Sequence, residues 1–145
     1  MAGDRPCLSP EVSATALAYV GDALFTLWVR TYYVRRGPAK QRELHRLCSG
    51  VVRAGAQAQW LGLVEDMLAE EEKSIVRWAR NAKIGKGGGG TSAERHLATG
   101  FEALLGYLYL TGQTTRLDSL LSFVVEHAAQ PGGQDIDSDP AQTHS

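Results

Sequence analysis

Apolar residues recur along this chain at the three- and four-residue spacing of α-helices, whereas the alternation typical of β-strands is scarce. Glycine, proline and small polar residues separate the apolar segments from one another. The pattern therefore predicts an all-α fold, a single helical bundle. We expect six helices, over about 9–36, 39–47, 51–61, 65–83, 93–110 and 115–129.

Local signals set the limits of these segments. Ser9 is a suitable N-cap residue, and Pro10 suits the first turn of the helix that follows. The glycine run at 85–90 predicts a flexible loop. We expect an N-terminal arm over 1–8, one domain over 9–129 and a disordered tail over 130–145. In the fourth helix, the stripe expected to face the core is Leu68, Ile75, Trp78, Ala79 and Ala82.

Two carboxylates stand alone in the two most apolar stretches. Asp22 is the only charged residue between positions 12 and 29, and Glu102 is the only one between positions 97 and 110. An ionised carboxylate is costly to bury unless it is paired, hydrogen-bonded or bound to a metal ion. We therefore expect Asp22 and Glu102 to form one shared site, built from two helices that are distant in the sequence.

Small residues surround both carboxylates at helical spacing. Ala18 lies one turn before Asp22, and Ala98, Thr99 and Gly106 lie within one turn of Glu102. Such a site has room for a hydrated cation, and Mg²⁺ suits it because Mg²⁺ prefers oxygen ligands and retains several waters. The alternative is that each carboxylate only satisfies a nearby backbone or arginine group.

A basic stripe without interleaved acids begins on the predicted fourth helix, opposite its apolar stripe. Its spacing of three and four residues places the side chains on one helix face, next to the glycine run. Such a surface suits a phosphodiester substrate. The alternative is a solvated helix face balanced by the acids at 70–72. The candidate RNA-binding residues are Lys73, Arg77, Arg80, Asn81, Lys83 and Lys86, and a second basic cluster contains Arg30, Arg35, Arg36, Lys40 and Arg42.

Composition narrows the class of protein. The chain has 145 residues, of which 43% are hydrophobic and 21% charged, enough for one domain with a core. The net charge of −1 gives no global signal for nucleic acid. Cys7 and Cys48 form no paired motif, which fits a reducing cytoplasm, and we expect neither a secretory signal nor a membrane segment. Trp28, Tyr32, Tyr33 and Trp60 are interpreted as core or interface residues.

The two carboxylate segments together resemble a known family. The segment around Asp22, Ala-Tyr-Val-Gly-Asp-Ala-Leu, resembles the signature helix of the ribonuclease III catalytic domain. The segment Phe-Glu-Ala-Leu-Leu-Gly-Tyr-Leu-Tyr-Leu around Glu102 resembles that family's second acidic motif. Over about 8–129 the chain is similar to the mini-ribonuclease III branch, which lacks a double-stranded-RNA-binding domain. The Arg-Asn-Ala-Lys segment at 80–83 and Thr99 support this assignment.

The resemblance implies a homodimeric, all-α endonuclease domain that cleaves double-stranded RNA with Mg²⁺ and leaves 5′-phosphate and 3′-hydroxyl ends. It implies a role in the maturation of large-subunit (23S) ribosomal RNA, a ribosomal RNA precursor as substrate, a cytoplasmic location and no nucleotide cofactor. Asp22 and Glu102 match the family's metal-binding acids. Asp22 would be the key catalytic residue, and Glu102 the principal metal ligand.

The chain departs from larger ribonuclease III enzymes at two acidic positions. Ala18 stands where those enzymes carry a glutamate, and Thr99 where they carry an aspartate. The site then has two expected acids per subunit, which should weaken Mg²⁺ binding unless RNA phosphate supplies ligands. Two alternatives remain open: a non-catalytic ribonuclease III-like protein that binds RNA or the ribosome, and a helical dimerisation module.

Overall fold

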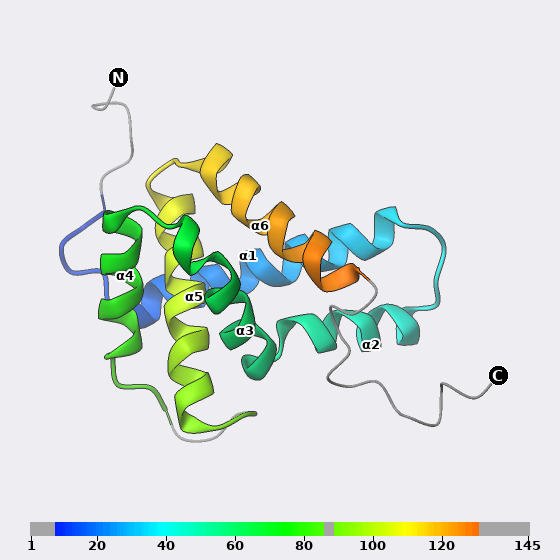
Figure 1. Cartoon of the computed structure of the whole chain (residues 1–145), viewed down its shortest axis with the longest axis horizontal. Helices are drawn as coiled ribbons and strands as arrows, with labels where there is room; N and C mark the ends of the chain where they lie inside the picture. Colours follow the sequence, from blue (N-terminus) through cyan, green and yellow to red (C-terminus); the bar gives the residue numbers. More distant parts are fainter. Residues whose placement is uncertain (1–7, 86–88, 131–145) are drawn as a thin grey trace.

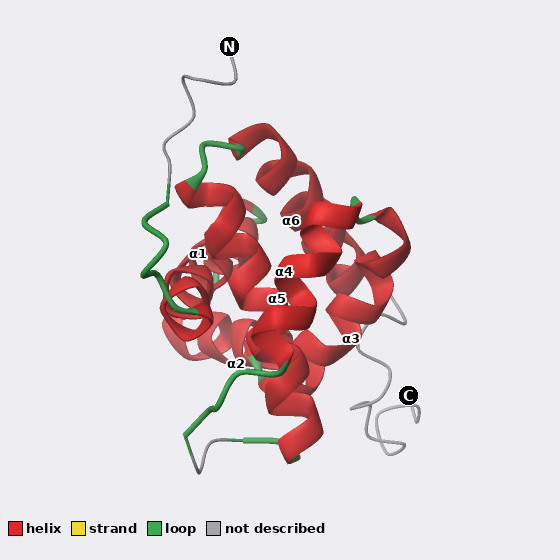
Figure 2. Ribbon diagram, turned by 90° about the vertical axis from the view of Figure 1, so that its left-hand side faces the viewer, coloured by secondary structure: helices red, strands yellow, loops and turns green. Residues whose placement is uncertain are grey.

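The computed structural model describes residues 8–85 and 89–130 of the chain. Every regular element among these residues is helical (Figures 1 and 2), which confirms the predicted all-α class. The elements are α1 (Ala14–Arg35), α2 (Gln41–Val52), α3 (Ala54–Val64), the 3-10 turn η2 (Glu65–Met67), α4 (Glu70–Arg80), α5 (Ser92–Leu110) and α6 (Thr114–Ala129).

Helix α5 is the centre of the bundle. It packs against α1, α3 and α4, and α6 lies along α1 on the remaining side (Figure 1). The core between α1 and α5 contains Phe25 and Phe101, both almost fully buried. Their rings meet edge to face with centroids 5.2 Å apart, the arrangement that aromatic pairs prefer. The burial of these apolar faces holds the two longest helices together.

Two glycines let the backbones of α1 and α5 touch. A Cβ atom on Gly21 would lie 1.7 Å from the carbonyl oxygen of Glu102, and one on Gly106 would lie 2.0 Å from that of Leu17. Only glycine permits such an approach, because any larger residue would overlap the neighbouring backbone. The crossing therefore brings Asp22, the residue after Gly21, next to Glu102.

The structure corrects three sequence predictions. The first helix begins at Ala14, because the hydroxyl of Ser13 accepts a hydrogen bond from the Ala16 amide at 3.0 Å, and residues 9–11 belong to a turn instead. Helix α4 ends at Arg80, which places Lys83 outside it. Trp78 does not face the core: it is 47% exposed, and α4 turns Val76 and Ala79 inward.

Several predicted features fall outside the described residues. These are most of the terminal arm and tail, the middle of the glycine run and Lys86. Over 8–85 and 89–130, no helix is both long enough and apolar enough to cross a membrane.

Candidate active site

Asp22 and Glu102 lie together where α1 crosses α5. Both residues line two adjoining cavities of about 290 and 580 Å³. Their side chains share a hydrogen bond, although the residues are eighty positions apart. The fold therefore joins the two isolated carboxylates into one solvent-accessible site.

The two carboxylates differ in exposure. The side chain of Glu102 is largely buried, whereas Asp22 is exposed at the rim of the cavities. The expectation that both would be buried is therefore wrong for Asp22, because the α1 face that carries Asp22 opens toward solvent. One carboxylate is thus held inside the fold, and the other is accessible to a large ligand.

The environment of Glu102 favours its neutral form. Burial, followed by the hydrogen bond and the negative charge of Asp22, raises the pKa of Glu102 to about 8, and a hydrogen bond from Gln57 acts in the opposite direction. Near neutral pH, in the absence of a cation, the pair therefore retains a proton. A divalent cation would displace that proton and relieve the repulsion between the two carboxylates.

The side chains fit a hydrated Mg²⁺ ion. In the described part of the chain, no three His, Cys, Asp or Glu side chains are grouped as a metal cage would require. Mg²⁺ commonly binds through one or two carboxylates and retains several waters, so Asp22 and Glu102 suffice. Ala18 and Thr99 line the larger cavity but supply no carboxylate, and the Thr99 hydroxyl donates to the Arg95 carbonyl at 2.9 Å.

Two polar residues at the site were missed by the sequence analysis. Gln57 of α3 and Arg95 of α5 line the smaller cavity together with both carboxylates. Arg95 precedes Glu102 by seven residues, two helical turns on one face, so helical spacing could have identified it. Gln57 reaches Glu102 only through the packing of α3 on α5, which no local pattern reveals.

The candidate RNA-binding residues lie in three places. Arg77, Arg80 and Asn81 line a cleft of about 260 Å³ with His96, which was not predicted. Lys83 lines the larger carboxylate cavity. Nζ of Lys73 lies 3.7 Å from Oε1 of Glu70, as expected of a solvated helix face on which acids balance the basic residues.

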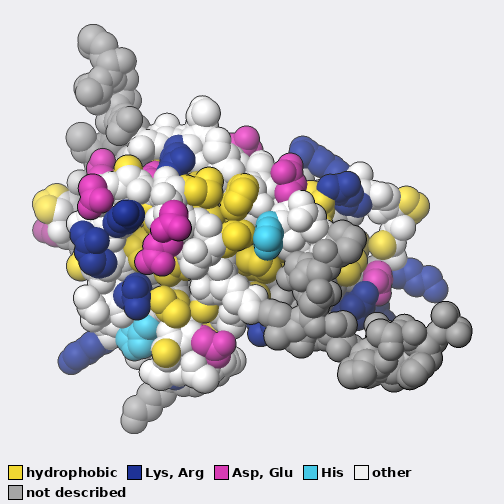
Figure 3. All heavy atoms as spheres, in the orientation of Figure 1, with side chains coloured by type: hydrophobic (Ala, Val, Ile, Leu, Met, Phe, Trp, Pro, Cys, Tyr) yellow, Lys and Arg dark blue, Asp and Glu magenta, His cyan; other side chains and the backbone are white. Residues whose placement is uncertain are grey.

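The cleft is fixed in place by a third close approach of helices. A Cβ atom on Gly100 would lie 2.8 Å from Cγ of Arg80, so the arginine stem rests directly on α5. Lys and Arg side chains gather over α4, with Asp and Glu beside them (Figure 3). The basic surface is therefore local, as the net charge of the chain requires.

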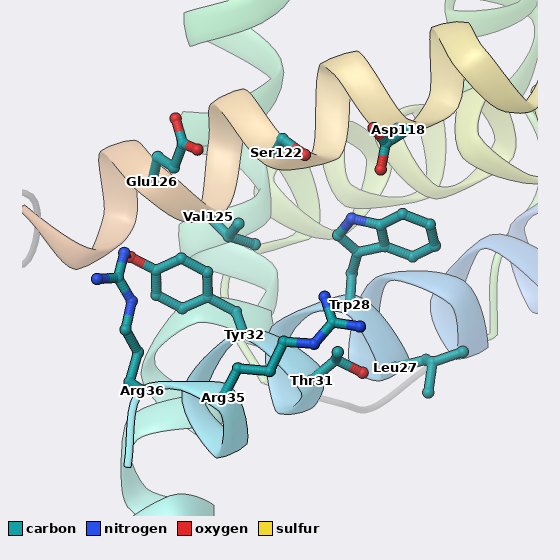
Figure 4. A pocket seen from close by; sticks show the side chains of 10 residues that line it. All are labelled: Leu27, Trp28, Thr31, Tyr32, Arg35, Arg36, Asp118, Ser122, Val125 and Glu126. Atoms are coloured by element: carbon teal, nitrogen blue, oxygen red, sulfur yellow. The ribbon is translucent and has the colours of Figure 1, made fainter.

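A separate groove of about 580 Å³ lies between α1 and α6 (Figure 4). Trp28 and Tyr32 line it from α1, and Arg36 lies over the Tyr32 ring at 4.3 Å. Asp118 and Glu126 line it from α6, so this part of the second basic cluster faces acids. The groove contains neither candidate carboxylate. Trp60, which the sequence also predicts to be a core or interface residue, is 4% exposed and belongs to the core.

Comparison with known proteins agrees with the fold. Residues 15–113, which include both carboxylates, match the family described as Ribonuclease III domain. A crystal structure of a protein from Fusobacterium nucleatum superposes with a TM-score of 0.74 at 28% identity, over 81% of this chain and 94% of that one. The fold and the site thus define a protein of the ribonuclease III class, the endoribonucleases that act on double-stranded RNA.

Curated relatives narrow the class further. The Mini-ribonuclease 3 of Desulfitobacterium hafniense is 47% identical over 74% of this chain and 68% of its own length. The Mini-ribonuclease 3 of a Thermoanaerobacter species is 41% identical over 80% of this chain and 82% of its own length. The Mini-ribonuclease 3 of a Synechocystis species is 39% identical over 88% of this chain and 87% of its own length. The chain therefore belongs to the mini-ribonuclease III branch of the ribonuclease III family.

Proposed function

We propose that the protein is a Mg²⁺-dependent endonuclease that cleaves double-stranded RNA and leaves 5′-phosphate and 3′-hydroxyl ends. The observation that carries the proposal is the contact of Asp22 with Glu102 at the α1–α5 crossing, inside the region that matches the family. Two carboxylates that share a proton, open to solvent on one side, form a site for a divalent cation. The cytoplasm and the maturation of 23S ribosomal RNA are the setting we propose.

The two acids take different roles in this proposal. Glu102, held by the fold, is the principal metal ligand, whereas Asp22, at the rim, also faces the RNA phosphate. The metal, when bound, supplies an activated water and stabilises charge on the phosphoryl oxygens. Because positions 18 and 99 bear no acid, the RNA phosphate completes the coordination that the protein leaves open.

The RNA backbone is held by the basic side chains on α4 and after it. Among these side chains, Lys83 shares a cavity with both carboxylates. Arg77, Arg80 and Asn81 present hydrogen-bond donors in the cleft beside α4. A-form duplexes are recognised mainly through phosphates and 2′-hydroxyls, which suits a shallow site of this composition.

A homodimer completes the proposal. Tyr19 lies one helical turn from Asp22 and is 82% exposed, an unusual state for an aromatic side chain beside a functional site. A second copy of the chain would cover it and place two carboxylate pairs along one duplex. Sedimentation of the full chain tests this state directly.

The test of the function is incubation of the purified protein with an end-labelled RNA duplex, in Mg²⁺ and in EDTA. We expect cleavage in Mg²⁺ only, with 5′-phosphate ends on the products. Asp118→Asn, an acid of the α1–α6 groove, is the matched control and should cleave like the wild type. Duplex binding without cleavage in several substrates would instead favour the non-catalytic RNA-binding alternative.

A further inference from the structure

Gln57 occupies an unusual position beside the carboxylate pair. Its side chain lies in the first turn of α3 and is only 3% exposed. Its amide nitrogen donates to the Val52 carbonyl oxygen at 2.7 Å and to Oε2 of Glu102 at 3.3 Å. One amide group thus joins the end of α2, the start of α3 and the carboxylate of α5.

The orientation of this amide follows from its partners. Val52 offers a carbonyl and Glu102 a carboxylate, and both groups accept hydrogen bonds. Only the NH₂ side of the Gln57 amide can serve them, so its oxygen must point elsewhere. That oxygen is buried, and it has no hydrogen-bond partner among the residues that the structure describes.

A buried oxygen without a partner destabilises a fold, and an apolar side chain of the same size would avoid this cost. Such a residue is expected where function requires the polar group. The group that Gln57 serves is Glu102. Its neighbours Ala98 and Leu105 at helical spacing carry no side-chain donor, and the hydroxyl of Thr99 donates to the Arg95 carbonyl instead. Gln57 is the side chain that holds one carboxylate oxygen in place and favours its charged form.

We propose that Gln57 is a positioning residue that orients the Glu102 carboxylate for a divalent cation, in a site that lacks two of the acids of larger relatives. This inference rests on the proposed function, since it concerns the same carboxylate pair. Groups that orient metal ligands typically contribute about 10- to 100-fold to metal affinity or activity. The competing explanation is structural: the amide serves only to satisfy the Val52 carbonyl at the end of α2.

Gln57→Leu separates the two explanations, because leucine fills a similar volume and removes both the donor and the buried oxygen. The probe is Mn²⁺ alone, titrated into the full chain and followed by electron paramagnetic resonance. Urea unfolding in EDTA reports stability. Gln59→Leu is the matched control, because Gln59 lies on the same helix and is exposed.

We expect Gln57→Leu to bind Mn²⁺ about 10-fold more weakly than the wild type, with an unchanged or higher unfolding midpoint in EDTA. Gln59→Leu should change neither quantity. Mn²⁺ affinity within twofold of the wild type would overturn the inference. A lower unfolding midpoint, or a variant that does not fold, would also overturn it, because the amide would then serve α2.

The two proposals can fail separately. If wild-type protein cleaves RNA and Gln57→Leu binds Mn²⁺ normally, the role of Gln57 is refuted and the nuclease stands. If Gln57→Leu weakens Mn²⁺ binding but the wild type cuts no duplex, the positioning role stands and the nuclease is refuted. Absence of Mn²⁺ binding by the wild type would overturn both.

Discussion

Replacing Glu102 by glutamine should stabilise the metal-free protein, and more so at high pH. Glutamine keeps the shape of the side chain, and its carbonyl oxygen can still accept from Gln57 while its amide faces Asp22. The substitution therefore removes the charge that the folded state disfavours. A functional carboxylate is expected to reduce stability in this way.

The sign of the pH dependence follows from the direction of the shift. Folding raises the pKa of Glu102 from 4.5 to about 8, so between these values the folded state retains a proton that the unfolded state has lost. Wild-type stability therefore falls as pH rises through this window. Glu102→Gln does not titrate there, so its advantage over the wild type is absent below pH 4.5 and complete above pH 8.

The pKa change sets the magnitude. At about 1.36 kcal/mol per pKa unit, the rise from 4.5 to about 8 corresponds to at most about 5 kcal/mol. Asp22 is exposed, so solvent screens its contribution, and we expect an advantage of about 2 to 3 kcal/mol at pH 9. Urea unfolding in EDTA at pH 5, 7 and 9 measures this difference.

Two comparisons make the experiment decisive. Glu126→Gln, an exposed acid on α6, should show the same pH dependence as the wild type. Added Mg²⁺ should stabilise the wild type by mass action but not Glu102→Gln, which narrows or reverses the difference. Stability curves of Glu102→Gln and wild type that run parallel from pH 5 to pH 9 would refute the reasoning.

Three further predictions test the parts of the site. Gly21→Ala should destabilise the fold by about 3 kcal/mol or prevent folding, because the added Cβ would meet the Glu102 carbonyl. The control is Gly62→Ala, in open space on α3, which should be neutral or stabilising by up to about 1 kcal/mol. Urea unfolding measures both differences. Neutralising Arg77, Arg80 and Lys83 together should weaken duplex binding and flatten the dependence of affinity on salt concentration. Lys73→Gln should have a smaller effect. An unchanged salt slope would show that the RNA binds elsewhere. Mg²⁺ binding should release protons near pH 7, visible in calorimetry as a heat that depends on the buffer; equal heats in all buffers would contradict the raised pKa of Glu102.

Much of the fold is encoded locally. Periodicity predicts each of the six α-helices found over residues 8–85 and 89–130, because each buries an apolar face that recurs every three to four residues. The start of the first helix is not encoded locally, because Ser9 and Ser13 are equally good N-cap residues. The burial of Ala14 and Leu17 under the other helices decides between them. Trp78 was misplaced because the inner face of α4 is fixed by α5, where Gly100 admits Val76 and Arg80.

The candidate site was predictable where its signal lies in the sequence. Asp22 and Glu102 stand out because each is a lone charge in an apolar helix, and the glycines near them indicate close backbone contact. Their different exposure was not predictable, since it depends on which face of α1 the rest of the bundle leaves open. Gln57 and His96 carry no local signal, because they join the site only through contacts between helices.

The central claim is that Asp22 and Glu102 act together in one metal-dependent site. The most direct measurement is single-turnover cleavage of an RNA duplex in Mg²⁺ by Asp22→Asn, Glu102→Gln and the double variant, each shown to be folded. Residues that act as a unit are strongly non-additive, so each single variant should lose nearly all activity and the double should be no worse. Substantial cleavage by Asp22→Asn, or losses that multiply in the double variant, would contradict the shared site.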